Sequence, residues 1–293
     1  MEREYTLEVP TPLGDEEIAL CQRSEGRHRF IAWHGITATN RFWYWDTFWE
    51  RGQVTLAGLP GHGPVRRHPR EHYLRWTAQH LIDVGVGTAR HLYNGEPMTL
   101  IGHSTGGLIA LGVALAAPEL VARLILLAPV VWGELSGIIG LWLRAAERPA
   151  LARLLISASL APGRWSYRLF RASLRSYASD AQGLYGNPRL DSTSRYGYPH
   201  YRLTSTDAVL GTVLALRTAN LRPLVLHRCP TMPTLLVHGD RDGVVPYRQS
   251  AWLVQALPQA SLVTVPGAGH MAYVESEQWV NAQVNAWCAE HPA

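Results

Sequence analysis

Lysine is absent from this chain of 293 residues, and all 27 of its basic residues are arginine. Genomic base composition accounts for this bias more simply than function does, although arginine and lysine differ in how they bind carboxylates and phosphates. Cysteine is scarce as well. The three cysteines, Cys21, Cys229 and Cys288, are too few and too scattered for a disulfide framework, and they show no metal-ligand spacing. We therefore expect no metal site and no cofactor.

A signal peptide and an uninterrupted membrane-spanning run are also missing. Residues 1–5 include three charged side chains and do not form the apolar core of a signal peptide. Residues 124–143 are apolar enough to suggest a membrane span, but Pro129, Glu134 and three glycines interrupt them, which favours a strand that runs into a loop. We expect a cytoplasmic protein with no integral membrane segment.

Charge is low and unevenly distributed. Charged residues make up 17% of the chain and hydrophobic residues 47%, which is typical of a folded globular protein with a large core. Residues 134–228 carry 13 arginines against five acidic residues, a balance of +8, and the rest of the chain has 14 − 18 = −4. We favour a solvated, arginine-rich helical face for this segment, and an anionic substrate or membrane surface stays open. The arginines are dispersed and match no recognition motif, so we expect no nucleic-acid partner.

Short apolar runs alternate with helical stretches along most of the chain. The runs predict strands at residues 5–9, 18–22, 29–33, 54–57, 98–102, 124–127, 234–238 and 261–265. Helices are predicted at residues 71–92, 106–116, 249–256 and 274–288. This alternation predicts an α/β fold with a doubly wound, mostly parallel sheet that carries helices on both faces.

The interval from about residue 133 to residue 222 breaks that rhythm. It has helical apolar periodicity, no convincing strand, and a run rich in tyrosine, glycine and proline at residues 185–201 that we interpret as a loop. An insertion of this length between two core strands is best explained as a helical cap. The predicted organisation is a core of residues 1–133 and 223–293, with the cap at residues 134–222.

The sequence Gly102-His103-Ser104-Thr105-Gly106 carries the strongest catalytic signal. It follows a predicted strand and opens a predicted helix, where glycines permit a sharp turn that presents Ser104. The start of a helix also favours developing negative charge. Ser104 is therefore the predicted nucleophile, and a serine hydroxyl needs a base, an acid that orients the base, and donors for the oxyanion.

Five motifs occur in a familiar order, and they resemble the motif set of the α/β-hydrolase superfamily. They are His34-Gly35, Leu59-Pro60-Gly61-His62-Gly63, the Ser104 motif with Gly107, His238-Gly239-Asp240-Arg241-Asp242-Gly243-Val244-Val245-Pro246 and Pro266-Gly267-Ala268-Gly269-His270. The resemblance covers the chain apart from the cap. It implies the α/β-hydrolase fold with an inserted helical cap.

By that resemblance the catalytic acid is Asp242 and the base is His270. Asp240, two residues earlier, is the main competitor for the acid, and Glu134 after the strand at 124–127 is a lesser one. The chain order of nucleophile, acid and base is the order of this fold. His103, His62 and His238 are interpreted as packing or structural residues.

The resemblance also implies that two backbone amides form the oxyanion hole. These are the N–H of Thr105, directly after the nucleophile, and the N–H of Ile36, after the His34-Gly35 turn. An aromatic cluster follows that turn and is interpreted as an amphipathic helix that also lines the acyl pocket: Phe42, Trp43, Tyr44, Trp45, Phe48 and Trp49.

A serine nucleophile excludes the haloalkane dehalogenases and epoxide hydrolases of this fold, which use aspartate at that position. The remaining prediction is acyl chemistry, with a carboxylesterase acting on an apolar to weakly polar small-molecule ester as the first choice. A lactonase, a thioesterase, a carbon–carbon bond hydrolase, an acyltransferase and a non-catalytic ligand-binding homologue stay open. The sequence leaves the oligomeric state undecided.

Overall fold

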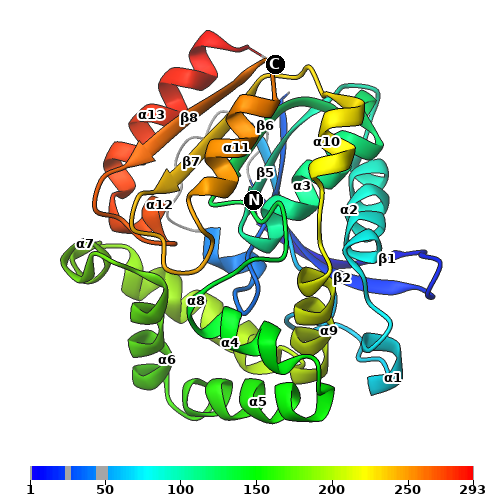
Figure 1. The fold of residues 1–293 in the computed structure, drawn as a ribbon, viewed down its shortest axis with the longest axis vertical. Coiled ribbons are helices and arrows are strands. Elements are labelled where there is room, and N and C mark those ends of the chain that lie inside the picture. Colours follow the sequence, from blue (N-terminus) through cyan, green and yellow to red (C-terminus); the bar gives the residue numbers. More distant parts are fainter. Residues whose placement is uncertain (1, 24–27, 44–51, 293) are drawn as a thin grey trace.

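The computed structural model describes residues 2–23, 28–43 and 52–292, and within them one eight-stranded sheet organises the chain (Figure 1). The strands are β1 (Arg3–Val9), β2 (Glu16–Arg23), β3 (Arg29–Trp33), β4 (Gln53–Ala57), β5 (Met98–His103), β6 (Val121–Leu127), β7 (Thr234–Gly239) and β8 (Ala260–Val265). Their order across the sheet is β1-β2-β4-β3-β5-β6-β7-β8.

Within the described sheet, β2 pairs antiparallel with β1 on one side and with β4 on the other. From β4 to β8 every neighbouring pair is parallel. Parallel strands need crossover connections, and the helices between them supply these. The predicted α/β-hydrolase fold with a mostly parallel sheet is confirmed.

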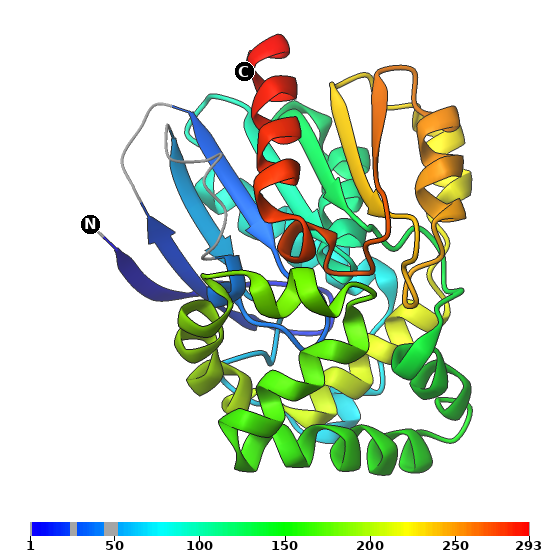
Figure 2. The ribbon, with the colours of Figure 1, turned by 90° about the vertical axis from the view of Figure 1, so that its left-hand side faces the viewer.

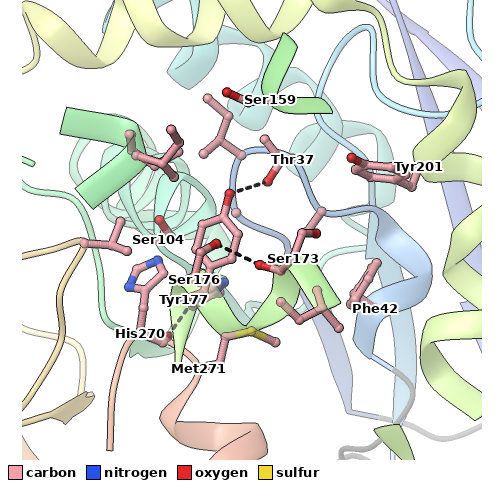
Figure 3. A pocket seen from close by; sticks show the side chains of 18 of the residues that line it. Thr37, Phe42, Ser104, Ser159, Ser173, Ser176, Tyr177, Tyr201, His270 and Met271 are labelled. Atoms are coloured by element: carbon pink, nitrogen blue, oxygen red, sulfur yellow. Dashed lines mark hydrogen bonds between the residues drawn. The ribbon is translucent and has the colours of Figure 1, made fainter. Parts of the chain in front are cut away.

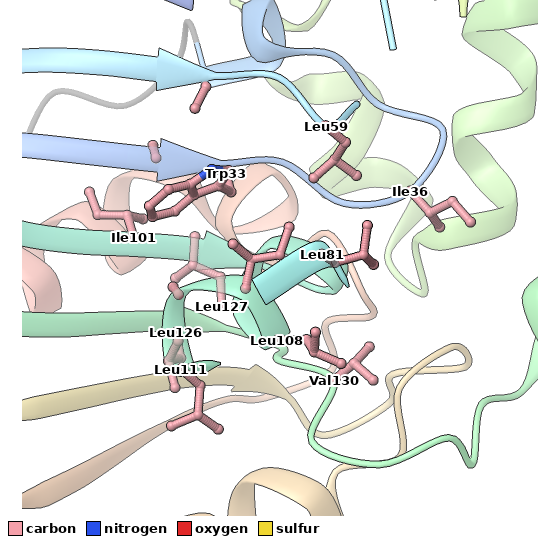
Figure 4. Close-up of a cluster of buried hydrophobic side chains, with 14 of the residues drawn as sticks. Trp33, Ile36, Leu59, Leu81, Ile101, Leu108, Leu111, Leu126, Leu127 and Val130 are labelled. Carbon is pink, nitrogen blue, oxygen red and sulfur yellow. The ribbon is translucent and has the colours of Figure 1, made fainter. Parts of the chain in front are cut away.

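Helices cover both faces of the sheet, which explains why the central strands are apolar on both sides. Figure 2 shows α13 (Glu277–Glu290) on one face, with α2 (Ala78–Leu92) and α3 (Thr105–Ala116) on the other. Every residue of β5 and β7 is buried. Figure 4 shows Leu108 and Leu111 of α3 in one buried cluster with Leu126 and Leu127 of β6. Burial of this apolar surface is the main stabilising contribution to the fold.

A helical segment lies between β6 and β7 and crosses the carboxyl ends of the parallel strands (Figure 2). Its helices are α4 (Gly137–Ala145), α5 (Pro149–Trp165), α6 (Tyr167–Ser173), α7 (Ala181–Gly186), α8 (Leu190–Leu203), α9 (Thr206–Arg217) and α10 (Arg222–Arg228). Among the residues that the structure describes, no helix combines the length and the apolar character needed to cross a bilayer.

Two predicted helices are each divided in the structure. The helix predicted at 71–92 is α1 (Arg70–Tyr73) followed by α2, because the Thr77 hydroxyl accepts a hydrogen bond from the His80 amide and starts a new helix. The helix predicted at 274–288 is α12 (Ala272–Glu275) followed by α13, with Ser276 between them. The remaining core helix is α11 (Arg248–Ala256), close to its predicted range.

The loop predicted at residues 185–201 is wrong, because most of it is helical. α7 ends at Gly186, and α8 includes Gly197 and Pro199 in its interior. Tertiary packing overrides the local breakers. A Cβ at Gly197 would lie 3.0 Å from the Phe42 ring, and Tyr201 of α8 packs on Phe170 with ring centroids 4.5 Å apart.

Candidate active site

Ser104 occupies the turn between β5 and α3 with φ 55° and ψ −115°, a backbone conformation that side-chain-bearing residues rarely adopt. Glycines on either side permit the turn. A Cβ on Gly102 would overlap the backbone oxygen of Gly106, and a Cβ on Gly106 would overlap the backbone oxygen of Trp33 at the end of β3. The sharp turn predicted from the glycine spacing is therefore present.

The elbow is tied to the neighbouring strand by backbone hydrogen bonds. The Ser104 amide donates to the Leu127 carbonyl at 3.0 Å, and the Ser104 carbonyl accepts from Val130 at 3.1 Å. The side chain is only 3% exposed and lies at the wall of a cavity. Its position at the first turn of α3 places unpaired helix amides beside it.

Asp242 and His270 come from different loops and meet at the carboxyl edge of the sheet. Oδ2 of Asp242 lies 2.8 Å from Nδ1 of His270. The other oxygen, Oδ1, accepts from the amides of Val244 and Val245 at 2.7 and 3.0 Å. Because an ionised carboxylate only accepts, Nδ1 of His270 carries the hydrogen, and Nε2 is left with its lone pair.

A second histidine holds the same carboxylate. Nε2 of His238 lies 3.0 Å from Oδ2 of Asp242, and neither side chain is exposed. Burial alone would raise the pKa of Asp242, but the charges and hydrogen bonds of His270 and His238 outweigh it and hold the pKa well below its ordinary value. The carboxylate therefore stays ionised at neutral pH. The sequence predicts a structural role for His238 and gives no sign of its contact with Asp242.

The two other acidic residues considered for this role lie elsewhere. Asp240 accepts from the Gly267 amide at 2.7 Å and so holds the turn after β8. Glu134 is exposed, and its carboxylate lies 2.6 Å from Arg248 and 2.9 Å from the Trp132 ring nitrogen. Neither has a hydrogen bond to His270 among the described contacts.

The loop that carries His270 is fastened to the helical segment by two contacts that the sequence did not reveal. The His270 amide donates to the Tyr177 carbonyl at 2.9 Å. Glu275, which is buried, accepts from the Gly269 amide at 3.0 Å and from the Ser179 and Asp180 amides at 2.9 and 2.6 Å. Burial raises the pKa of Glu275. No local pattern distinguishes this glutamate from the other acidic residues.

His103, next to Ser104, packs against His270 with ring centroids 4.6 Å apart. Its Nε2 lies 3.1 Å from the His270 carbonyl oxygen. Burial, and then the nearby His270, lower the pKa of His103 well below its ordinary value, so the ring is neutral. The packing role predicted for His103 agrees with this position, and the hydrogen bond also fixes the backbone of His270.

The turn after β3 lies directly against Ser104. A Cβ on Gly35 would be 3.0 Å from the Cβ of Ser104, and Ile36 lines the same cavity. His34 fixes this turn, since its ring lies 2.8 Å from the Gly35 oxygen through Nδ1 and accepts from the Leu59 amide at 3.2 Å through Nε2. Burial lowers the pKa of His34 to about 3.

One cavity joins the elbow, His270 and the helical segment (Figure 3), with about 840 Å³ of empty space that includes the solvent at its mouth. Figure 3 shows Ser104 and His270 toward one end and Phe42 and Tyr201 toward the other. The apolar part of its wall consists of Ile36, Ala38, Phe42, Ile138, Ile139, Trp142, Leu160, Phe170, Leu174, Val244, Met271 and Tyr273. Hydroxyls come from Thr37, Ser159, Ser173, Ser176, Tyr177 and Tyr201.

The aromatic cluster predicted to line the pocket is only partly described. Phe42 and Trp43 lie in a 3₁₀ helix (Asn40–Trp43) and are buried. Phe42 contributes to the cavity wall, as predicted. The other four members, Tyr44, Trp45, Phe48 and Trp49, lie outside the described residues.

No arginine, aspartate or glutamate is among the described residues that line the cavity. Arginines of the helical segment instead pair with acidic residues at its surface. Arg153 lies 2.6 Å from Asp207 and Arg195 lies 2.7 Å from Asp191; the Asp207 side chain is 23% exposed and the other three are 45–64% exposed. These pairs agree with the solvated, arginine-rich face that the sequence favours for this basic segment.

Known proteins resemble this chain in sequence and in fold. A family model described as "Serine aminopeptidase, S33" matches residues 54–277, well over half of the chain. The chain belongs to this family of α/β hydrolases. This hydrolase is 31% identical to the "Putative carbamate hydrolase RutD" of Pseudomonas savastanoi pv. phaseolicola over 88% of this chain and 92% of the relative. It is 27% identical to the pimeloyl-[acyl-carrier protein] methyl ester esterase of Nitrosomonas europaea over 79% of this chain and 84% of the relative.

Solved structures agree on the fold. An esterase from Thermogutta terrifontis superimposes on the hydrolase with a TM-score of 0.69 at 18% identity, covering 99% of this chain and 100% of the other. The enol-lactonase of Burkholderia xenovorans LB400 gives a TM-score of 0.69 at 16% identity, covering 93% and 97%. At such identities the likeness concerns the fold alone.

Proposed function

We propose that this protein is a serine hydrolase that cleaves carboxylic esters through an acyl-enzyme, with Ser104 as nucleophile, His270 as base and Asp242 as acid. The observation that carries the proposal is the 2.8 Å contact between Asp242 and His270, whose ring lines the same cavity as the strained Ser104. A positive φ at a non-glycine residue costs free energy, and such strain is characteristic of functional sites.

The proposed reaction has two halves. Nε2 of His270 takes the hydroxyl proton as Oγ of Ser104 attacks the ester carbonyl carbon. The ester C–O bond then breaks, and the alcohol leaves with the proton that His270 returns. In the second half, His270 removes a proton from water, the resulting hydroxide attacks the acyl carbon, and the acid leaves as the proton returns to Ser104. The ionised Asp242 stabilises the imidazolium in both halves.

The negative oxygen of each tetrahedral intermediate needs fixed donors. We assign them to the amides of Thr105 and Ile36. Thr105 is the first residue of α3, where an amide has no partner within the helix. The turn that contains Ile36 packs against Ser104, and His34 fixes that turn. Preorganised amides of this kind contribute on the order of 10²- to 10³-fold to the rate.

The acyl group that fits best is uncharged. The cavity wall is largely apolar. A buried carboxylate without a partner there costs on the order of several kcal/mol. We also propose that residues 134–222 act as a cap, since α4, α5 and α6 contribute Ile139, Leu160 and Phe170 to the cavity. This cap selects the acyl group by its shape.

A carbamate is the second candidate substrate, because the RutD relative is 31% identical over nearly its whole length. The same triad would then form a carbamoyl-enzyme. An aminopeptidase activity, which the name of the family suggests, is less well supported. A free substrate amine needs an acidic partner, and none of the described residues of the cavity wall supplies one.

A substrate panel tests the proposal. It contains nitrophenyl esters of graded acyl length, a methyl ester, an ester with a terminal carboxylate, a lactone, a thioester, a carbamate and an aminoacyl nitroanilide. We expect neutral esters to be cleaved fastest, and the ester with a terminal carboxylate at least about 10-fold more slowly. Ser104→Ala should reduce kcat by about 10³-fold or more. Preferential cleavage of the nitroanilide, or unchanged activity in Ser104→Ala, would overturn it.

A further inference from the structure

A second cluster of titratable side chains lies where β2 begins and where α1 and α2 meet. Glu16 is the first residue of β2 and is 1% exposed. His72 belongs to α1, His80 to the first turn of α2, and His68 precedes α1. None of these side chains lines the cavity of Ser104.

All three histidines present Nε2 to the carboxylate of Glu16. The Nε2 atoms of His72 and His80 lie 2.6 and 2.9 Å from Oε1, and that of His68 lies 3.3 Å from Oε2. The donor atoms of Glu16, His72 and His80 all lie within 4.8 Å of one another. Convergence of one carboxylate and three imidazoles from separate elements goes beyond what a single ion pair requires.

Hydrogen bonds within the cluster leave buried nitrogen atoms unsatisfied. Nε2 of His68 has no partner with hydrogen-bond geometry, and neither has Nδ1 of His80. A buried polar atom without a partner costs about 1–3 kcal/mol, so such atoms in a native protein call for an explanation. A ligand bound at the centre of the cluster supplies one for His68.

We propose that Glu16, His72 and His80 bind a divalent transition-metal ion of the zinc class, with His68 as the fourth ligand. Imidazole nitrogen and carboxylate oxygen are the ligands that Zn²⁺ takes besides thiolate. Tetrahedral coordination at about 2.1 Å requires neighbouring ligand atoms about 3.4 Å apart. The present carboxylate–imidazole separations of 2.6–3.3 Å would therefore need to open by less than 1 Å.

Two further features support the site. The backbone of His80 is fixed by the Thr77 cap, since the Thr77 hydroxyl accepts from the His80 amide at 3.2 Å. The charge balance also fits, because a divalent ion compensates a buried carboxylate.

The site would fasten the N-terminal hairpin to the base of the helical segment. The α1 region packs against α9, since a Cβ on Gly211 would lie 2.8 Å from the Tyr73 carbonyl and from the Trp76 ring. The role of the ion is therefore structural, and it acts on the stability of the fold at a place separate from Ser104. If no ion binds at this cluster, the proposed ester hydrolysis at Ser104 is unaffected.

Metal binding is measured directly on the full chain. The protein is stripped with a chelator and titrated with Zn²⁺ and with Co²⁺. We expect one ion per chain with a Kd of about 1 μM or below, the visible absorption of tetrahedral Co²⁺, and a higher Tm in the loaded protein. Glu16→Gln and His80→Gln should each weaken binding at least about 10-fold. The control is His91→Gln, an exposed histidine of α2 outside the cluster, which should bind as the wild type does.

Two outcomes would overturn the proposal. One is that the wild type binds no more Zn²⁺ than Glu16→Gln, which would leave the cluster a hydrogen-bond network. The other is binding that all variants share, which would mean adventitious surface histidines. X-ray absorption of zinc-loaded wild type covers the case in which a variant does not fold. At least two imidazole ligands support the site, and oxygen ligands alone contradict it.

Discussion

Asp242 and Asp240 are chemically identical and lie two residues apart, yet their surroundings separate their roles. Asp242 contacts His270, whereas Asp240 holds the Gly267 amide. We predict that Asp242→Asn lowers kcat by about 10³- to 10⁴-fold, because an amide cannot favour the required tautomer of His270. Asp240→Asn is the matched control and should change kcat by less than about 3-fold. Steady-state kinetics on a neutral ester give both values, and the reverse ranking would assign the role to Asp240.

His34 gives stability a pH dependence. Its pKa is about 3 in the fold because the ring is buried, against an ordinary value of 6.5, so the unfolded chain binds more protons between these values. Stability therefore falls as pH decreases from about 6.5, by up to about 1.4 kcal/mol per pH unit for this one histidine. We predict that His34→Gln reduces that slope by about this amount between pH 4 and 6. Urea unfolding across this range measures it, with His91→Gln as control. An unchanged slope in His34→Gln would contradict the assignment.

At this scale the sequence predicted some contacts and could not predict others. The motif resemblance favours Asp242 over Asp240, and the two loops do bring Asp242 to His270. The second partner, His238 of β7, is brought to Asp242 by packing that no sequence spacing indicates. The sequence does not reveal the Glu16 cluster, and it predicts no metal site. The histidines of the cluster are close in sequence, but the carboxylate comes from β2, so only the fold brings them together.

Among the elements, the turn between β5 and α3 depends most on a single residue type. Gly106→Ala would force a Cβ into the backbone of Trp33, and backbone cannot move aside without disturbing β3. We predict a loss of more than about 2 kcal/mol in the free energy of unfolding. Gly186→Ala, where no heavy atom lies within 4 Å, should stay within about 0.5 kcal/mol. Denaturant titration compares them, and equal effects would show that the close approach at Gly106 is relieved.

Helix α5 offers a test of the proposed cap, since one of its faces lines the cavity and another faces solvent. Leu160 lines the cavity, and Leu154 is 64% exposed. We predict that Leu160→Trp lowers kcat/KM for long-chain esters about 10-fold or more and leaves an acetate ester within about 3-fold. Leu154→Trp should leave the chain-length profile unchanged. A uniform loss across all chain lengths in Leu160→Trp would indicate disruption of the fold and not selection by shape.

Core elements were predictable because each is encoded locally, and the helical segment was less so. Buried apolar runs such as β7 are bounded by turn signals, and this pattern is visible in the sequence without knowledge of the packing. In α8, Gly197 and Pro199 act as local breakers, yet contacts with Phe42 and Phe170 hold the helix. Thr77 divides a periodic run that looks continuous in sequence. Helix N-caps and long-range packing are the features that a single sequence predicts least reliably.

For the whole molecule, the parallel sheet explains why residues far apart in sequence converge. The turn after β3, Ser104 after β5, Asp242 after β7 and His270 after β8 all follow carboxyl ends of strands, which lie at one edge. In open α/β sheets this edge is where ligands bind. The helical segment covers that edge and closes the cavity over it (Figure 2). No arginine is among the described residues that line the cavity.

Labelling with a fluorophosphonate tests the central claim most directly, because the reagent reacts with a serine only when a base and an oxyanion site activate it. The native protein is incubated with the probe, and the modified peptide is identified by mass spectrometry, with circular dichroism as a check on folding. We predict one equivalent of label on Ser104, none in Ser104→Ala, and much slower labelling in Asp242→Asn than in Asp240→Asn. A folded wild-type protein that takes no label, or takes it on another residue, would contradict the account.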